Sequence, residues 1–186
     1  MPLTIAIKHD ADKAVEKLRD QLTRRAPRAA AAGLNRTAQA AQTAAVRAIQ
    51  KDLGASAQKT IRRNLSIQRA TPQKLEASLI ARSAKTDRIP IYELRPRPST
   101  VTKHRPAGGV RYGPQGKQIP GSFIARLKSG HVGVFARQAQ TRLPITELKG
   151  PSIALVLSRP RVHGQVQKVI AEKLPKEMHS AFRFAR

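Results

Sequence analysis

The sequence predicts an α+β protein, in which a small and mostly antiparallel sheet is flanked by long helices and accompanied by an extended basic loop. Small residues recur at intervals of three or four in the first third of the chain, which is typical of a helix. Alternating apolar residues and turn signals dominate the middle, and helical spacing returns in residues 162–186. The 186 residues suit a single domain with helical extensions.

The first 25 residues predict a strand followed by a helix. Apolar and polar residues alternate over residues 3–7, which is typical of a short, half-buried strand. Asp10 and Asp12 can then cap a helix that runs to Arg25. The two carboxylates could instead belong to a metal-dependent nuclease site, but no second acidic cluster in the sequence would complete it. Helix capping is therefore the better interpretation.

A second, longer helix is predicted over residues 28–53. Pro27 suits its first turn, where the missing N–H is not needed, and Gly54 suits a left-handed cap at its end. One narrow face carries mostly small side chains and should pack closely against another backbone. That face consists of Leu34, Ala38, Ala41, Ala45, Ala48 and Ile49.

A third, short helix is predicted after Gly54, with Ser56 as its cap. Helical spacing turns Ile61 inward, with Leu65 one turn later. Arg62 and Arg63 then face the solvent, where they could contact phosphates.

Two strands are expected next. Residues 75–81 alternate and predict a strand, with a one-turn helix over residues 72–76 as the alternative. Residues 89–94 predict a strand that lies at a sheet edge or begins at Pro90, because proline cannot donate a hydrogen bond to a neighbouring strand.

Residues 95–118 form a basic segment rich in proline and glycine. They contain four Pro and four Gly with little periodicity, which predicts a loop or a long hairpin in which residues 110–112 are partly paired. Residues 95–142 hold ten Lys or Arg and no acid. Loops of this length in compact domains are usually functional or mobile. Two interpretations stay open: a solvated excursion, or an arm that becomes ordered against a partner or against phosphates.

The stretch after this loop is expected to build the sheet. Residues 123–127 and 131–135 alternate on either side of Ser129 and Gly130, which supply the positive-φ turn of a hairpin. Residues 143–148 can extend this sheet, and residues 150–152 are expected to end it.

The chain closes with a predicted helical segment over residues 162–186. An apolar run at residues 153–157 precedes it and is interrupted by Pro160. Pro175 should kink the helix or start a new segment. The residues that share its apolar face are Val166, Val169, Ile170 and Leu174.

Charge is the strongest global signal in the sequence. There are 36 Lys and Arg against 11 Asp and Glu, a formal net charge of +25. Self-repulsion at this charge opposes compaction unless anions offset it, so we expect the chain to lie beside nucleic acid or an acidic protein surface. With only two Tyr, four Phe and no Trp, few side chains can stack on bases. Any contact with nucleic acid should therefore involve its backbone.

The sequence predicts no catalytic, cofactor or metal site. It has no Cys, and its five His have no partner at metal-ligand spacing. The glycines of residues 108–116 lack the Lys-Ser/Thr and the helix that follow a nucleotide-binding loop, and no Ser lies in a nucleophile-elbow pattern. Neither a signal peptide nor a run of about 20 apolar residues is present, so we expect a soluble protein.

The best candidates for contacts with a partner or with phosphates lie in three places: the paired arginines of the short helix, the basic arm formed by residues 95–118, and the tip of the hairpin around Ser129 and Gly130. They are Arg62, Arg63, Arg95, Arg97, Lys103, Arg105, Arg111, Lys117, Lys128 and His131.

Seven short segments carry a resemblance to a known family. They are GLNRT (33–37), IPI (89–91), IPGSFIA (119–125), KSGHV (128–132), VFAR (134–137), RLPITELKGPS (142–152) and LPKE (174–177). In this order, and over most of the chain, they resemble the minor tail protein Z family of tailed bacteriophages.

The resemblance implies a structural virion protein of the neck or tail-completion type, with no enzyme activity. It implies a small sheet flanked by helices and assembly as a ring, for which we favour a hexamer, with a dodecamer as the alternative. The implied partners are neighbouring neck and tail-terminator proteins, with nonspecific contact to genomic DNA. The protein would be assembled in the host cytoplasm and reside in the virion. Composition alone leaves open an alternative, a nonspecific nucleic-acid-binding basic protein.

Overall fold

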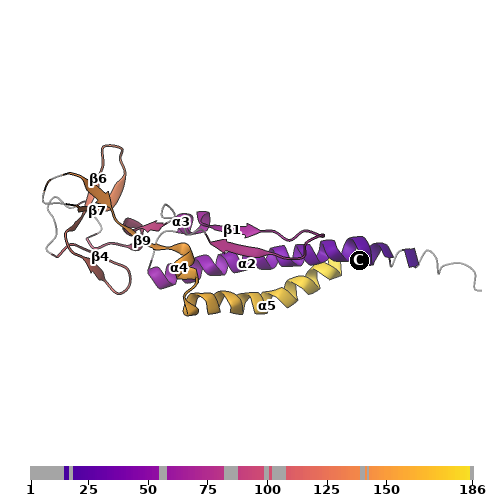
Figure 1. Cartoon of the computed structure of the whole chain (residues 1–186). Coiled ribbons are helices and arrows are strands. Elements are labelled where there is room, and N and C mark those ends of the chain that lie inside the picture. Colours follow the sequence, from indigo (N-terminus) through magenta and orange to yellow (C-terminus); the bar gives the residue numbers. More distant parts are fainter. Residues whose placement is uncertain are drawn as a thin grey trace, which may run out of the picture.

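Two long helices lie side by side, and a lobe of short strands caps one end of the pair (Figure 1). This arrangement gives the protein an elongated shape and confirms the predicted α+β class. The predicted strand at residues 3–7 and the caps Asp10, Asp12 and Ser56 lie outside the described residues. The structure is a computed structural model that describes residues 15–16, 19–54, 58–81, 88–98, 101, 108–138, 141 and 143–184.

The first long helix, α2 (Ala26–Leu53), continues from the short π-helix η1 (Gln21–Arg25). The expected separation of two helices near Pro27 is therefore wrong. Pro27 lies in the first turn of α2, directly after the π-helix, and the chain stays helical across it. The predicted end is confirmed, since Gly54 caps α2 in the left-handed conformation with φ 61°.

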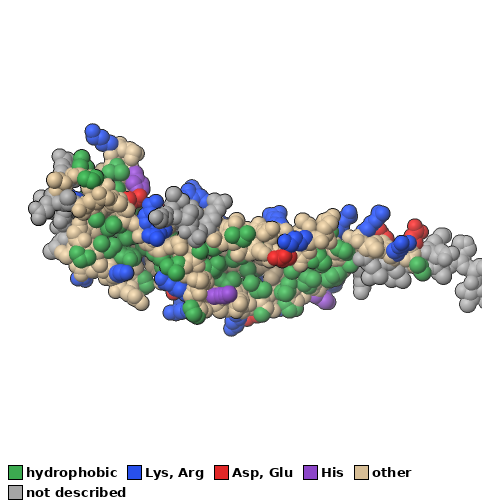
Figure 2. Space-filling model, viewed as in Figure 1, with side chains coloured by type: hydrophobic (Ala, Val, Ile, Leu, Met, Phe, Trp, Pro, Cys, Tyr) green, Lys and Arg blue, Asp and Glu red, His purple; other side chains and the backbone are tan. Residues whose placement is uncertain are grey.

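The second long helix, α5 (Pro160–Phe184), returns along α2 in the opposite direction (Figure 1). The predicted small-residue face of α2 is confirmed as a packing surface: Leu34 is half-buried and its other five members are buried. Pro175 lies inside α5 without starting a new segment, and the helix begins two residues before the predicted Val162. In the view of Figure 2, hydrophobic side chains follow the seam between the two helices.

The helix α3 (Gln58–Arg63) matches its prediction, with Ile61 buried and both arginines exposed. Leu65 is also buried, but it begins a strand that was not predicted, β1 (Leu65–Gln68). This strand pairs antiparallel with β2 (Ser78–Ala81). The strand expected over residues 75–81 is therefore shorter than predicted, and the alternative helix over residues 72–76 does not form.

The strand predicted over residues 89–94 is correct only at its start. β3 (Arg88–Pro90) gives way to a 3₁₀ helix, η3 (Ile91–Leu94), because the prolyl residue ends the ladder and Ile91 and Leu94 turn into the core. Residues 150–152 do not end the sheet as expected. They belong to β9 (Lys149–Ser152), which pairs with β3.

The apolar run that follows β9 is the helix α4 (Ile153–Leu157). Its start is fixed by Ser152, whose Oγ accepts a hydrogen bond from the Leu155 amide at 3.3 Å. Ile153 and Val156 are fully buried and join the core formed by α2, α3 and the first turns of α5.

The predicted hairpins of the lobe are confirmed. β6 (Ser122–Arg126) pairs with β7 (Val132–Arg137), which in turn pairs with β8 (Ile145–Glu147). Within the basic segment, β4 (Val110–Tyr112) pairs with β5 (Lys117–Ile119). Ser122 joins the two parts of the lobe, because its buried hydroxyl accepts from the Val110 amide at 2.8 Å and donates to the Ile119 carbonyl at 2.6 Å.

Candidate functional site

The turn between β4 and β5 lies where the strand lobe meets the end of α2. A Cβ atom on Gly54 would lie 3.2 Å from Cδ of Pro114 in this turn, so the helix cap and the turn are in contact. The Gly113 amide donates a hydrogen bond to the Leu94 carbonyl at 3.1 Å. The turn is thus held from two directions, and a cleft lies on each side of it.

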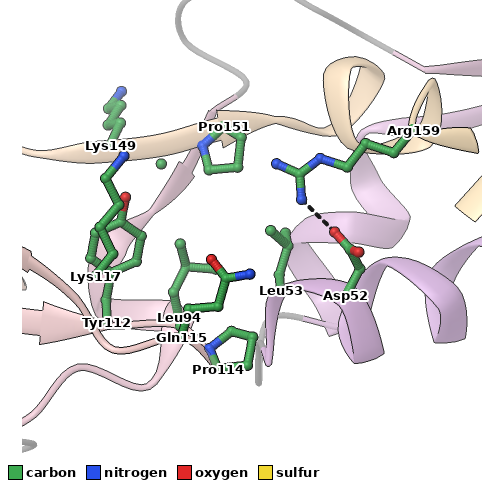
Figure 3. Close-up of a pocket in the computed structure, with 12 residues that line it drawn as sticks. Asp52, Leu53, Leu94, Tyr112, Pro114, Gln115, Lys117, Lys149, Pro151 and Arg159 are labelled. Carbon is green, nitrogen blue, oxygen red and sulfur yellow. Dashed lines mark hydrogen bonds and ion pairs between the residues drawn. The ribbon is translucent and has the colours of Figure 1, made fainter. Parts of the chain in front are cut away.

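The first cleft has a volume of about 400 Å³ and is bounded by α2, the turn, β9 and the start of α5 (Figure 3). Asp52 and Arg159 form an ion pair across one wall, with 2.5 Å between Oδ2 and Nη1. Lys117 and Lys149 come from the opposite, strand side. Within the described part of the chain, neither lysine forms an ion pair, so the strand side carries unmatched positive charge.

The second cleft has a volume of about 420 Å³ and lies on the other side of the same turn. Arg95, Arg97 and Arg111 line it, and all three are exposed. Arg97 and Arg111 pair as an isolated antiparallel bridge: each amide donates to the other residue's carbonyl, at 2.7 and 3.0 Å. Arg95 adopts a left-handed conformation with φ 53°, which is uncommon for a residue with a side chain. We call Arg95, Arg97 and Arg111 the arginine cleft.

The structure brings some of the predicted contact residues together and separates others. Three of the ten line the arginine cleft, and Lys117 lies across the turn from them. Arg62 and Arg63 lie on α3, and Lys128 lies in the β6–β7 turn. His131 follows that turn, with its Nε2 2.8 Å from Oε1 of Glu147, so its ring is held against the lobe's own sheet. Lys103 and Arg105 lie outside the described residues.

The sequence reading missed three charged residues of the first cleft: Asp52, Lys149 and Arg159. They come from the end of α2, from β9 and from the residue before α5. No local pattern joins positions so far apart in the chain. The one signal in the sequence was Asp52, an acid in the last turn of the long helix. The helix dipole disfavours a negative charge at this end, so a basic partner is favourable there.

Positive side chains are not confined to these clefts. In the view of Figure 2, Lys and Arg are spread along the helices and over the lobe, with few acids among them. Among the described residues, no group of three or more His, Asp or Glu could hold a metal ion. In the same residues, no helix is long and apolar enough to cross a membrane.

One comparison with known proteins found a match that covers nearly the whole chain. Residues 8–185 match the protein family described as prophage minor tail protein Z. Searches of curated proteins and of solved structures gave no match. The family match spans nearly all of the 186 residues and confirms the resemblance found in the seven sequence segments. The chain therefore belongs to the prophage minor tail protein Z family, whose name places it among the structural proteins of phage tails.

Proposed function

We propose that the protein completes the phage tail and joins it to the DNA-filled head, as a structural component of the neck. The observation that carries this proposal is the match of residues 8–185 to a minor tail protein family. The formal charge of +25 supports a position beside a polyanion or an acidic protein ring, because either would offset the self-repulsion of the subunit.

The protein acts as a ring of identical subunits in this proposal, with six copies favoured and twelve as the alternative. The elongated body of Figure 1 suits side-by-side packing around a channel. Large apolar side chains are exposed on the lobe and on α4 and α5, and burial between subunits would remove them from water. They include Leu143, Leu155, Phe182 and Phe184.

Deletion of the gene tests the tail role. We expect lysates of the deletion strain to contain DNA-filled heads and separate tails in electron micrographs, with few infectious particles. Addition of the purified protein to such a lysate should restore infectivity. Infectious, fully joined particles in the absence of the protein would contradict the proposal.

A second measurement tests the ring. Light scattering of the purified protein, alone and with isolated tails, should detect a particle of six subunit masses, and twelve would select the alternative. A protein that stays monomeric, is absent from purified virions and binds DNA with a steep salt dependence would instead be a nonspecific nucleic-acid-binding protein.

The basic arm can be tested in the same complementation assay. We expect replacement of Arg95, Arg97, Arg111 and Lys117 by Gln to lower head–tail joining without lowering the unfolding temperature of the subunit. The matched control replaces Arg28, Arg47, Arg126 and Lys168 by Gln, four exposed residues outside the clefts. Equal yields from both variants would remove the arm from the mechanism.

A further inference from the structure

Arg97 and Arg111 place two like charges directly opposite each other. Their reciprocal hydrogen bonds, at 2.7 and 3.0 Å, define a directly opposed antiparallel pair. Side chains of such a pair leave the same face, with Cβ atoms about 5 Å apart, and like charges in this position are destabilising. Arg95 adds a third positive charge to the same cleft. An anion bound between the guanidinium groups would reverse this repulsion.

The described part of the chain does not supply that anion. Five of its acids form ion pairs, none of them with the arginine cleft: Asp20, Asp52, Glu76, Glu147 and Glu177. A sixth, Glu93, accepts a hydrogen bond from Thr60 at 3.0 Å. With 36 basic residues against 11 acids, a second copy of the chain is also a poor source of carboxylates. The formal net charge of +25 therefore favours a different molecule as the source of the counter-charge.

We infer that the arginine cleft binds phosphate groups, with Arg97 and Arg111 on either side of the anion and Arg95 beside them. Guanidinium groups form paired, charge-assisted hydrogen bonds with phosphate oxygens. One guanidinium group can use both oxygens of a single carboxylate, which would leave the other two arginines without an anion. A nucleic-acid strand instead presents a phosphate every 3.4 Å or so along its axis, so neighbouring phosphates can serve all three residues.

The surroundings of the arginine cleft favour the phosphate backbone over the bases. Gly116 also lines the cleft, and a Cβ atom built on it would meet no other part of the described chain within 4 Å, so a strand can approach the protein backbone there. Tyr112 is the only aromatic residue among the lining residues, so the cleft has no series of rings on which bases could stack. Binding should therefore be insensitive to nucleotide sequence.

This inference deepens the proposed function, because it names the chemistry that a basic subunit in the neck would meet. It rests on that function only for the source of the phosphate, which would be genomic DNA. The test uses the purified full-length protein and requires neither a ring nor a tail. A negative result for phosphate binding would therefore not contradict the tail role. If the gene deletion contradicted the tail role, phosphate binding could still be measured on the purified protein.

The experiment measures the affinity for a 30-base-pair DNA duplex by fluorescence anisotropy over a series of salt concentrations. Arg97→Gln/Arg111→Gln is compared with Arg28→Gln/Arg47→Gln, which removes the same charge from exposed positions on α2. We expect the cleft variant to lose affinity and the slope of log affinity against log salt to fall by about 2, since each phosphate contact contributes about 0.9. An equal loss in the control variant would overturn the proposal.

Two further arms identify the ligand. Inorganic phosphate should compete with the duplex at the cleft, and binding of inorganic phosphate without binding of DNA would keep the site but make the free ion its ligand. Polyglutamate should bind more weakly, and equal binding that depends on Arg97 and Arg111 would overturn the phosphate assignment in favour of an acidic protein. Arg97→Lys/Arg111→Lys keeps the charge but loses the guanidinium fork, and we expect intermediate affinity from it.

Discussion

A Cβ atom on Gly33 would lie 2.7 Å from the sulfur of Met178, so the missing side chain of Gly33 lets α5 approach α2. The same hypothetical atom would lie 3.2 Å from the backbone carbonyl oxygen of Glu177. One turn along α2, Arg36 forms an ion pair with Glu177 at 3.6 Å. Two of the segments that resemble the family, 33–37 and 174–177, thus meet each other in the structure. Their residues fix how the end of α5 lies on α2.

Replacement of Gly33 by Leu should lower the free energy of unfolding by about 1–3 kcal/mol, the usual cost of forcing extra volume into a packed contact. Leu is a far better helix former than Gly, so helix propensity alone would change stability in the opposite direction. Denaturant unfolding measures the change. Gln39→Leu, at an exposed position of the same helix, is the matched control and should change stability by less than about 0.5 kcal/mol. A stabilising Gly33→Leu would show that α5 does not pack here.

Asn35 should prove important for the segment between β1 and β2. Its side chain donates to the Ala70 carbonyl at 3.0 Å and accepts from the Ala70 amide at 2.8 Å. Asn35→Ala removes both hydrogen bonds and should cost about 1–3 kcal/mol of unfolding free energy. Hydrogen exchange gives a local measurement, since the Ala70 amide should lose protection in this variant. Gln39→Ala changes a side chain with no such contact, and unchanged exchange at Ala70 in Asn35→Ala would refute the assignment.

The sequence predicted the parts of the fold that depend on local chemistry. The extent of α2 from the Ala-rich spacing and Gly54, the hairpin around Gly130, and the inward turn of Ile61 all follow from periodicity and turn residues. The failures occur where a partner from a distant segment decides the outcome. Residues 149–152 become β9 because β3 is available to pair, and Pro151 gives no hint of this. Likewise, β1 forms only because β2 lies beside it.

The candidate site was predicted in part. Arg95, Arg97, Arg111 and Lys117 were chosen for lying in an acid-free segment, and the structure arranges them around one turn. The pairing of Arg97 with Arg111 depends on how the segment folds back on itself, and the contribution of Arg159 depends on how α5 packs against α2. Neither relation has a signature in sequence spacing.

The contact between Gly54 and Pro114 joins the helical body to the lobe. Substitutions at the two residues should therefore have coupled effects on the free energy of unfolding. Gly54→Ala places a Cβ at φ 61° and 3.2 Å from the proline ring, so we expect a loss of about 1 kcal/mol or more in unfolding free energy. In Gly54→Ala/Pro114→Ala, the ring is gone and only the backbone strain remains. The double variant should therefore be more stable than the sum of the two single changes predicts, as calorimetry can determine. Strict additivity would mean that the two residues do not interact.

The effect of Asp52→Asn on the free energy of unfolding should depend on whether Arg159 is present, because the two residues form an ion pair. Asp52 is near the C-terminus of α2, where the helix dipole disfavours a negative charge by about 0.3–1 kcal/mol, and Arg159 offsets that cost at 2.5 Å. Asp52→Asn should therefore destabilise the wild-type protein slightly, by less than about 1 kcal/mol because Arg159 is nearly half exposed.

In an Arg159→Gln background, the same Asp52→Asn substitution should instead stabilise the protein, because only the unfavourable dipole interaction is then removed. A double-mutant cycle by urea unfolding measures this coupling, and 1 M salt should reduce it through screening. The exposed pair Lys74–Glu76, at 3.3 Å, serves as the control and should show coupling close to zero. The same sign for Asp52→Asn in both backgrounds would show that Arg159 does not offset the charge of Asp52.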